Sequence, residues 1–444
     1  MNATAAPKER RWEAPYAEAE LDAVVRVPGS KSMTARALIL AALASGPSTI
    51  RRPLIARDTL LMVEGLRSIG VAVDTGDDDA WVVTPPRRSL RAVDSQSAFK
   101  GGTEVDCGLA GTVMRFLPPV AALADGPVGF DGDPHARKRP NDGVIKALRD
   151  LGVAIEDGGR MALPFTVNAT GNVKGGELEV DASKTSQLVS ALLMAAPRFE
   201  NGLDLRHVGD RPVPSRPYLD MVVHMMRQAG ADVDDSEPNR WRVAPGELQG
   251  REWVIEPDLQ NAAPFLIAAA AVGGRVTVEG WPTETTQAGD KIRDLLVQLG
   301  SRVEWSRGGL TVVGSPSVLP VELDLADAAE LTPTLAALFG VNKGPFTIRG
   351  VAHIRGHETD RVSALVTELR KIGADVDEFE DGFRVNSGGR TTGTWATYAD
   401  HRMAHAGAVA GLVIPGLVLD DVACVSKTWP DFAEVWERAV RGDA

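Results

Sequence analysis

Six apolar runs of about a dozen residues, each with the composition of a buried helix, recur along the chain and precede short β-rich stretches. Examples are ALILAALASG before STI, PFLIAAAAVGG before RVTV and LTPTLAALFGVNKG before PFTI. Each run ends near a glycine, and these glycines are 70 to 80 residues apart: Gly46, Gly126, Gly202, Gly274, Gly344 and Gly416. Spacing this even indicates an internal repeat, which restricts the architecture before any motif is considered.

A second periodic glycine marks another helix in each repeat. It lies between an amphipathic segment and a strand in LRSIGVAVD, LRDLGVAIED, MRQAGADVDD, LVQLGSRVEW and LRKIGADVDEF. These five glycines are Gly70, Gly152, Gly230, Gly300 and Gly373. Each repeat is therefore predicted to contain two helices and several strands, with glycine ending each helix in the left-handed conformation.

The length and charge of the chain limit its class. A chain of 444 residues is too long for one core and suits two or three domains, so six repeats divide naturally as three plus three. The net charge of −12 argues against nucleic-acid or membrane-surface partners, which need a basic face. An anionic small molecule could still bind a local cluster of basic groups.

The cysteines and the N-terminus favour a cytoplasmic protein. Cys107 and Cys424 are the only cysteines, which suits a reducing compartment, although a single bridge between them stays open. The first twenty residues lack the apolar core of a signal peptide, and the longest apolar stretch, PFLIAAAAV, is too short to span a bilayer. We expect a soluble, cytoplasmic chain.

The polar residues that precede the six apolar runs occupy equivalent positions. They lie 13 to 16 residues before the repeat glycines and are Lys31, Thr112, Ser186, Asn261, Glu330 and His401. Symmetric repeats would present several helix N-termini in the same direction, and each offers free N–H donors to a phosphate or carboxylate. Serine, asparagine and aspartate there could simply be caps.

Basic residues near these helix starts point more strongly to an anion. A cation in a first helical turn opposes the helix dipole, so Lys31, Arg36, Arg115 and Arg402 lack a stabilising role there. The loops HARKRPND (135–142) and RGHETDR (355–361) add further charge. For any single basic residue, a solvated surface position is the simpler alternative.

Other familiar signatures are absent or incomplete. PGSKS lacks the first glycine of a nucleotide phosphate-binding loop, and no G-x-G-x-x-G follows a strand. His353 with His357, and His401 with His405, have the spacing of helical metal ligands but no obvious third ligand. We therefore expect neither a metal nor a cofactor.

Seven ordered motifs together resemble a known family. PGSKSMTAR, LAGTVMRF, KRP (138–140), TSQ, HETDR, ADHRMA and SKTWPDF resemble 5-enolpyruvylshikimate-3-phosphate synthase over about Leu21 to Phe432. The resemblance implies an α/β fold of two globular domains, each of three βαβαββ-like units, the inside-out barrel of enolpyruvyl transferases. Matched here, the domains would be 1–28 plus 258–444 and 29–257, hinged near 27–29 and 256–258.

The resemblance also implies a reaction. The enolpyruvyl group of phosphoenolpyruvate would be transferred to the 5-hydroxyl of shikimate 3-phosphate by addition and elimination, with release of phosphate and without a cofactor or metal. This step belongs to the shikimate pathway to chorismate and aromatic amino acids. The family further implies a cytoplasmic monomer with small-molecule substrates only, and glyphosate as an inhibitor.

The motifs match the family's site residues position by position. The residues matching those that bind shikimate 3-phosphate are Lys31, Ser32, Arg36, Thr185, Ser186, Gln187, Ser215, Glu330 and His357. Those matching the phosphoenolpyruvate site are Lys31, Gly111, Arg139, Gln187, Arg361, Arg402 and Lys427. Glu330 matches the catalytic carboxylate, with Asp327 as the alternative, and Lys31 and Glu358 complete the expected catalytic groups.

Four departures from the family pattern affect the pocket. Thr185 replaces a common serine and His357 a common lysine, so one substrate contact could depend on pH. Leu109 replaces a common asparagine, and Phe116 a common proline. Because Gly111 matches a residue facing phosphoenolpyruvate, Gly111→Ala is expected to weaken glyphosate.

Two rival functions remain. The related transferase that acts on UDP-N-acetylglucosamine carries asparagine after the first lysine and a reactive cysteine on a mobile loop, whereas Ser32 follows Lys31 here. A non-catalytic anion-binding protein of the same fold would be expected to lose Glu330 or Lys427, and both are present.

Overall fold

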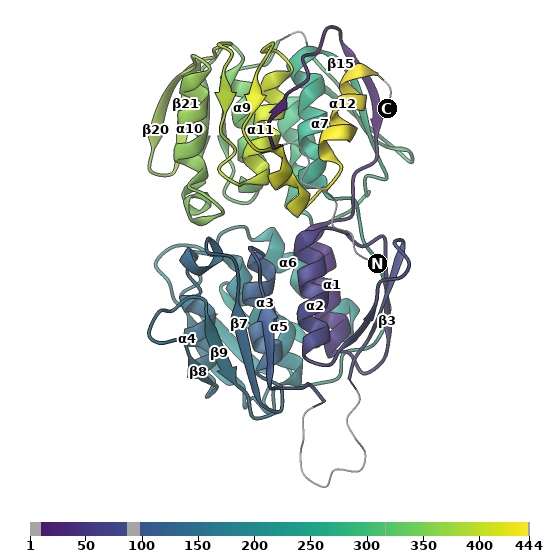
Figure 1. Ribbon diagram of the computed structural model, residues 1–444, viewed down its shortest axis with the longest axis vertical. Coiled ribbons are helices and arrows are strands. Elements are labelled where there is room, and N and C mark those ends of the chain that lie inside the picture. Colours follow the sequence, from purple (N-terminus) through teal and green to yellow (C-terminus); the bar gives the residue numbers. More distant parts are fainter. Residues whose placement is uncertain (1–9, 87–97, 316, 443–444) are drawn as a thin grey trace. The chain divides into compact units, whose positions relative to one another are not determined.

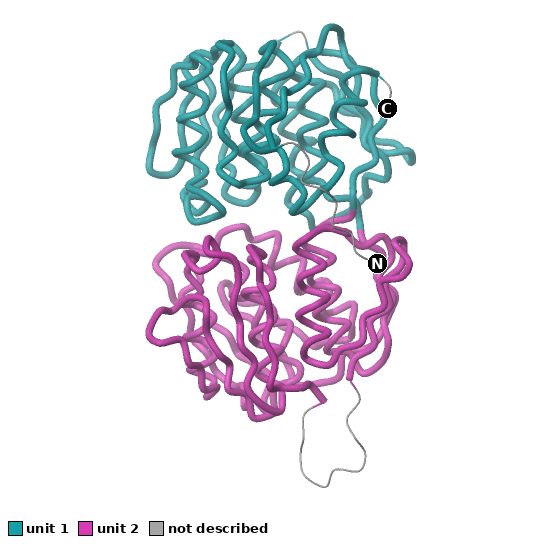
Figure 2. Tube along the Cα trace, in the orientation of Figure 1, with its two compact units in different colours: residues 1–28, 256–444 teal, residues 29–255 magenta. Residues whose placement is uncertain are grey.

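A computed structural model describes residues 10–86, 98–315 and 317–442. The chain divides into two compact units: unit 1 comprises residues 1–28 and 256–444, and unit 2 comprises residues 29–255 (Figure 2). Glu256 and Pro257, which the sequence analysis assigns to the second domain, fall in unit 1. Each unit contains its own cluster of buried apolar side chains, so each has a separate hydrophobic core.

The six apolar runs form the buried helices of the two units, which confirms the repeat. Nearly every residue of these helices is inaccessible to solvent, so they lie inside their units (Figure 1). In unit 2 they are α1 (Lys31–Leu43), α3 (Gly111–Ala121) and α5 (Ser186–Ala195). In unit 1 they are α7 (Leu259–Val272), α9 (Thr332–Gly340) and α11 (His401–Gly411).

Each buried helix is followed by a strand, as predicted. These strands are β3 (Ser48–Arg51), β7 (Pro127–Asp131), β11 (Leu203–His207), β15 (Gly274–Glu279), β19 (Phe346–Arg349) and β23 (Val418–Leu419). The second helices of the repeats are amphipathic and bury one face. They are α2 (Arg57–Ser68), α4 (Asp142–Asp150), α6 (Pro217–Gln228), α8 (Ile292–Gln298), α10 (Arg361–Lys371) and α12 (Phe432–Arg441).

The glycine prediction is confirmed for one set and partly wrong for the other. All five glycines after the second helices have positive φ, between 85° and 95°. Among the repeat glycines, only Gly202, Gly274 and Gly416 do. The helices before the other three, Gly46, Gly126 and Gly344, end earlier on residues of ordinary negative φ, so those glycines lie in the turns beyond.

Unit 2 contains three four-stranded sheets of one design. Their strand orders are β14–β3–β5–β4, β6–β7–β9–β8 and β10–β11–β13–β12, and in each the first pair is parallel while the others are antiparallel. The remaining strands are β4 (Ala72–Asp74), β5 (Ala80–Thr84), β6 (Thr103–Asp106), β8 (Ala154–Glu156), β9 (Phe165–Asn168), β10 (Gly176–Val180), β12 (Val233–Asp234), β13 (Arg240–Val243) and β14 (Glu252–Val254).

Unit 1 repeats this design twice and shortens it once. Its sheets are β16–β17–β15–β2, β18–β19–β21–β20 and the three-stranded β1–β23–β22. Because β2 pairs with β15, the start of the chain folds with its second half. The strands are β1 (Trp12–Glu13), β2 (Leu21–Val25), β16 (Arg302–Ser306), β17 (Gly309–Val313), β18 (Val321–Asp324), β20 (Asp375–Phe379), β21 (Gly382–Ser387) and β22 (Thr394–Trp395).

Six short 3-10 helices complete the described chain. They are η1 (Ala136–Lys138), η2 (Ala196–Arg198), η3 (Ala288–Lys291), η4 (Ala329–Leu331), η5 (Ala352–Gly356) and η6 (Val422–Lys427). Four of them, η1, η4, η5 and η6, carry or adjoin residues that the sequence analysis places in the active site. Within the described ranges, no helix has both the length and the apolar character needed to cross a lipid bilayer.

Candidate active site

The first residue of α1, Lys31, is paired with a buried carboxylate. Its Nζ lies 3.4 Å from Oδ2 of Asp58, a residue of the first turn of α2 that is only 2% exposed. The other carboxylate oxygen of Asp58, Oδ1, is buried without a recorded partner. Asp58 does not stand out in the sequence, because an aspartate in a first helical turn is usually explained by the helix dipole.

Arg36, in the second turn of α1, is buried without a carboxylate partner in the described chain. Its Nη1 donates to the carbonyl oxygen of Ser32 at 3.0 Å and its Nη2 to Oγ of Ser190 at 3.3 Å, whereas its Nε has no partner. The guanidinium lies 5.3 Å from the ring centroid of Phe116. Burial lowers the pKa of Arg36 to about 10. A buried cation with neutral contacts alone is costly, which favours an anionic ligand there.

Two further guanidinium groups lie at the start of α3. A Cβ atom on Gly111 would be 3.0 Å from Nη1 of Arg115 and 3.1 Å from Nη2 of Arg139. Arg115 Nη1 also donates to Oε1 of Gln187 in α5 at 3.2 Å, and Arg139 Nη1 donates to the carbonyl oxygen of Leu109 at 3.2 Å. The sequence-predicted residues Gly111, Arg139 and Gln187 are therefore close together.

The start of α5 completes the group of helix starts in unit 2. Thr185 is the N-cap, and its Oγ1 accepts a hydrogen bond from the backbone N of Gln187 at 3.2 Å, so its hydroxyl caps α5 as a serine hydroxyl could. Ser186 is buried, and Ser215, with φ of 54°, immediately precedes the segment leading into α6. Arg36 contacts the first turn of α6 by donating to the carbonyl oxygen of Tyr218 at 3.4 Å.

Two predictions about the basic residues of unit 2 are wrong in part. Arg36 and Arg115 lie in second rather than first helical turns, where the helix dipole has little effect on a charge. The unfavourable feature of these two cations is therefore their burial, not the helix dipole. In the basic loop at 135–142, Arg137 is exposed and paired with Asp131 at 2.6 Å and 2.9 Å. Of that loop's basic residues, Arg139 is the one recorded in contact with the predicted site.

In unit 1, Arg361 at the start of α10 forms the centre of an ionic network. It is 1% exposed, and its Nε and Nη2 bind the two oxygens of Asp400 at 2.7 Å and 3.1 Å. Its Nη1 donates to Glu330 at 2.8 Å and its Nη2 to Glu358 at 3.0 Å. Burial alone would lower the pKa of Arg361, but the three carboxylates outweigh it and hold the pKa well above its ordinary value.

Glu330 lies in η4, directly before α9, and faces three positively charged or protonatable groups. Oε2 is 2.8 Å from Arg361 Nη1 and 3.5 Å from Arg402 Nε, and Oε1 is 3.3 Å from His357 Nδ1. Burial raises the pKa of Glu330, but these groups outweigh it and hold the pKa well below the ordinary value. Asp327, the alternative carboxylate, is exposed and has no recorded ion pair with a described cation.

The other two predicted site cations of unit 1, Arg402 and Lys427, also have partners. Arg402, in the first turn of α11, donates to the carbonyl oxygen of Gln260 at 2.8 Å and to its Oε1 at 3.2 Å. Lys427, at the end of η6, forms a short ion pair with Glu358. Three cations thus face three carboxylates, Glu330, Glu358 and Asp400. The expectation that Arg402 lacks a stabilising role is wrong, because Glu330 and Gln260 provide one.

Asp400 is a functional candidate that the sequence analysis missed. It is fully buried, caps α11 by accepting from the backbone N of Arg402 at 2.9 Å, and holds Arg361 with both oxygens. It stands in the ADHRMA motif, where its position suggests a simple N-cap. Its pairing with a residue 39 positions away could not be inferred from spacing.

The remaining candidate groups are the two histidine pairs and the two cysteines. His353 and His357 have ring centroids 6.1 Å apart, and burial together with His357 lowers the pKa of His353 to about 4. His405 is fully buried against Phe432. In residues 10–86, 98–315 and 317–442, no three His, Cys, Asp or Glu side chains are grouped as metal ligands. Cys107 and Cys424 are free thiols, so the possible bridge is not formed.

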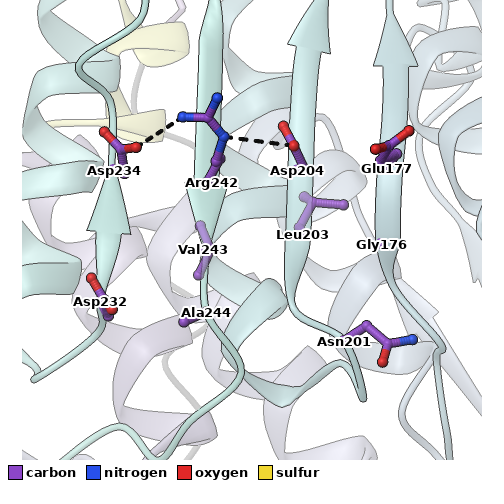
Figure 3. A pocket seen from close by; sticks show the side chains of 10 residues that line it. All are labelled: Gly176, Glu177, Asn201, Leu203, Asp204, Asp232, Asp234, Arg242, Val243 and Ala244. Atoms are coloured by element: carbon purple, nitrogen blue, oxygen red, sulfur yellow. Dashed lines mark hydrogen bonds and ion pairs between the residues drawn. The ribbon is translucent and has the colours of Figure 1, made fainter.

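A shallow pocket elsewhere in unit 2 contains none of the predicted site residues. It lies on the sheet β10–β11–β13–β12, where Glu177, Asp204, Arg242 and Asp234 stand side by side on adjacent strands (Figure 3). Arg242 Nη1 binds Asp234 at 2.9 Å, and its Nε lies 3.7 Å from Asp204. The carboxylates thus have a cation between them, and we interpret this row as a solvated sheet face.

Comparison with known proteins identifies the family. The family model for EPSP synthase, 3-phosphoshikimate 1-carboxyvinyltransferase, matches residues 15–436. A 3-phosphoshikimate 1-carboxyvinyltransferase from Kocuria rhizophila is 48% identical over 435 residues, covering 97% of this chain and 96% of that protein.

Solved structures show the same fold at lower identity. An EPSP synthase from Acinetobacter baumannii matches with a TM-score of 0.78 at 23% identity, covering 97% of this chain and 98% of that one. The enolpyruvyl transferase NikO from Streptomyces tendae matches with a TM-score of 0.71 at 17% identity and the same coverage. The predicted α/β transferase fold is confirmed, and with the family model and the Kocuria relative these matches show that the chain belongs to the EPSP synthase family.

Proposed function

We propose that this chain transfers the enolpyruvyl group of phosphoenolpyruvate to the 5-hydroxyl of shikimate 3-phosphate and releases phosphate. Its family membership supports this reaction. The observation that carries the proposal is the pairing of Glu330 with Arg361 and Arg402, which puts an ionised carboxylate among groups suited to an anionic substrate.

We infer that unit 2 supplies most contacts to shikimate 3-phosphate. Arg36 is buried and has no carboxylate partner among the described residues. The starts of α1 and α5 offer Lys31, Ser32, Thr185, Ser186 and Gln187, with Ser215 before α6. A phosphate placed there would neutralise a charge that neutral groups alone now surround. His357 and Glu330 of unit 1 are proposed to contact the same substrate.

Phosphoenolpyruvate is proposed to bind Gly111, Arg139 and Gln187 of unit 2 and the cations Arg361, Arg402 and Lys427 of unit 1, with Lys31 contributing to both substrates. The cluster at Gly111 supports this assignment, because a ligand oxygen could approach the bare backbone where a side chain would meet two guanidinium groups.

Glu330 is proposed as the base that accepts the 5-hydroxyl proton. A carboxylate whose pKa is held well below its ordinary value is a weak base while its contacts with Arg361 and Arg402 persist. We infer that the anionic groups of phosphoenolpyruvate take over contacts of Arg361 and Arg402, which would raise the basicity of Glu330 as the substrates bind. Glu330 would thus be activated as a base when phosphoenolpyruvate binds.

The reaction requires two further proton transfers, for which Glu358 and Lys31 are the remaining candidate groups. When the hydroxyl oxygen bonds to C2 of phosphoenolpyruvate, the methylene carbon takes a proton. When phosphate leaves C2, the methyl group loses one and the double bond returns. Glu358 is paired with Lys427 and Arg361, so it is a candidate for moving this second proton, with Lys31 as a further catalytic group.

The acceptor can be tested directly. Purified protein is incubated with phosphoenolpyruvate and either shikimate 3-phosphate or UDP-N-acetylglucosamine, with and without a chelator, while phosphate release is measured. The proposal predicts release only with shikimate 3-phosphate and the same rate with the chelator. Release with the nucleotide sugar alone would assign the chain to the rival reaction, and folded protein inactive with both would refute the proposal.

A cytoplasmic, monomeric state is a further proposal, and light scattering would check the mass.

A further inference from the structure

Two consecutive non-glycine residues immediately before Asp400 adopt an unfavourable backbone conformation. Tyr398 has φ of 56° and Ala399 has φ of 54°, and both lie in the left-handed region. Residues with a Cβ atom rarely adopt this conformation, and they keep it only where neighbouring groups enforce it. Strain of this kind, directly before the carboxylate Asp400 and close to the cation Arg402 of the ionic network, suggests a functional reason.

Two acidic side chains from other parts of unit 1 hold this segment. Glu368, a fully buried residue of α10, accepts from the hydroxyl of Tyr398 at 2.6 Å through Oε1 and from the backbone N of Ala396 at 3.0 Å through Oε2. Asp420 Oδ1 accepts from both the backbone N and Oγ1 of Thr397, each at 2.8 Å. Every residue from 396 to 398 is thereby fixed by a charged acceptor.

The fixed segment determines where Asp400 lies. Asp400 immediately follows the two left-handed residues, and its carboxylate caps Arg402 and binds Arg361 at two points. We propose that Glu368 and Tyr398 are positioning residues that, through the strained turn at 398–399, place Asp400 and so orient Arg361 and Arg402. In its consequence for phosphoenolpyruvate this inference rests on the proposed function.

The alternative is that the Tyr398 hydroxyl contributes only general stability. The two can be separated, since a positioning role acts at the start of α11 and on one substrate. Tyr398→Phe removes only the hydroxyl. Tyr16→Phe is a matched control, because Tyr16 is 47% exposed in the same unit and makes no recorded hydrogen bond in the described chain.

Hydrogen exchange at the amides of residues 400–404 and steady-state kinetics would test the inference. In Tyr398→Phe we expect exchange at these amides to accelerate about tenfold, the factor corresponding to one lost hydrogen bond to a charged group, and the KM for phosphoenolpyruvate to rise about as much. The turnover number and the KM for shikimate 3-phosphate should stay within about twofold, and Tyr16→Phe should match wild type in all respects.

A second variant tests the role of backbone strain. Adding Ala399→Gly to Tyr398→Phe should restore much of the protection, because glycine adopts positive φ without cost. Unchanged exchange at 400–404 in Tyr398→Phe, or acceleration spread evenly over unit 1, would overturn the inference. If wild-type protein does not turn over the two substrates, the proposed function fails, while the exchange measurement still decides the positioning role.

Discussion

Arg36 and Arg361 are both buried arginines with opposite surroundings. Arg361 is paired with three carboxylates, whereas no described carboxylate pairs with Arg36. A buried charge without a counter-charge lowers the free energy of unfolding. Removing one partner from a buried ionic network has the same effect, because the remaining charges are left uncompensated. The two residues should therefore respond in opposite ways to the same substitution.

Arg36→Met is expected to leave the free energy of unfolding unchanged or increase it, while weakening shikimate 3-phosphate binding. Arg361→Met should lower the free energy of unfolding by about 3–5 kcal/mol, because Asp400, Glu330 and Glu358 lose their shared cation. Chemical denaturation of both variants at neutral pH measures the difference. A loss of stability in Arg36→Met comparable with that of Arg361→Met would contradict this account.

Gly111→Ala is expected to weaken inhibition by glyphosate. The added methyl group would lie 3.0 to 3.3 Å from the guanidinium nitrogens of Arg115 and Arg139, which must then shift. The inhibition constant against phosphoenolpyruvate should rise, with a smaller rise in the KM for phosphoenolpyruvate. Gly46→Ala is the control, since a methyl group there meets nothing within 4 Å. An inhibition constant unchanged in Gly111→Ala would refute the placement of phosphoenolpyruvate at α3.

At the residue scale, the sequence identified the cations of the site but only some of their partners. Arg361 stands out in the sequence because it lies in an ordered motif, and Glu330 because it precedes an apolar run at a position equivalent to that of Lys31. Asp58 and Asp400 do not, because each resembles an ordinary helix-start aspartate until the fold brings it to Lys31 or Arg361. The significance of Phe116 likewise depends on the arginine that packs against it.

At the element scale, the spacing of glycines predicted where helices end but not which of these glycines adopt positive φ. Gly152 follows α4 with φ of 85°, whereas Gly46 follows α1 without a positive φ. Both glycines are predicted from the repeat pattern to end a helix in the left-handed conformation. Only the backbone conformation, which depends on where each helix stops, distinguishes a required glycine from a replaceable one.

Gly152→Ala should lower the free energy of unfolding by about 1–2 kcal/mol, while Gly46→Ala should leave it unchanged or raise it slightly. Neither methyl group would meet an atom within 4 Å, so the pair isolates the conformational cost. Urea denaturation of the two variants tests this. Equal stability of the two would show that φ at residue 152 carries no cost.

The loop between β8 and β9 predicts a pH dependence of stability. Asp157 accepts from Arg149, from the backbone N of Met161 and from that of Gly159, and these bonds lower its pKa from 3.8 to about 2. A lowered pKa in the folded state adds stability above the ordinary value and loses it as the pH falls through the folded value. Asp157→Asn should therefore lower the melting temperature at neutral pH, with the difference shrinking between about pH 4 and pH 2. A difference independent of pH would contradict the assignment.

At the scale of the whole molecule, the repeat pattern predicted the architecture well. Even glycine spacing indicated six helix–strand units, and the structure has six buried helices, each followed by a strand, in the described chain. The pattern could not show that the third sheet of unit 1 is built from three short strands, including residues near the N-terminus. That pairing depends on contacts between residues about 400 positions apart.

In the proposed function, the two units have different roles in substrate binding and catalysis. The unpaired cation Arg36 belongs to unit 2, whereas the carboxylate proposed as the base, Glu330, belongs to unit 1. Affinity for shikimate 3-phosphate and catalytic rate should therefore be separable by mutation.

The most direct test measures turnover and shikimate 3-phosphate affinity in Glu330→Gln, with Asp327→Asn as the control. Glutamine keeps the size of the side chain but cannot accept the hydroxyl proton. The account predicts that turnover falls by about two to four orders of magnitude in Glu330→Gln while the calorimetric Kd for shikimate 3-phosphate stays within about threefold. Asp327→Asn should behave as wild type. Near-normal turnover in Glu330→Gln, or its loss in Asp327→Asn instead, would contradict the account.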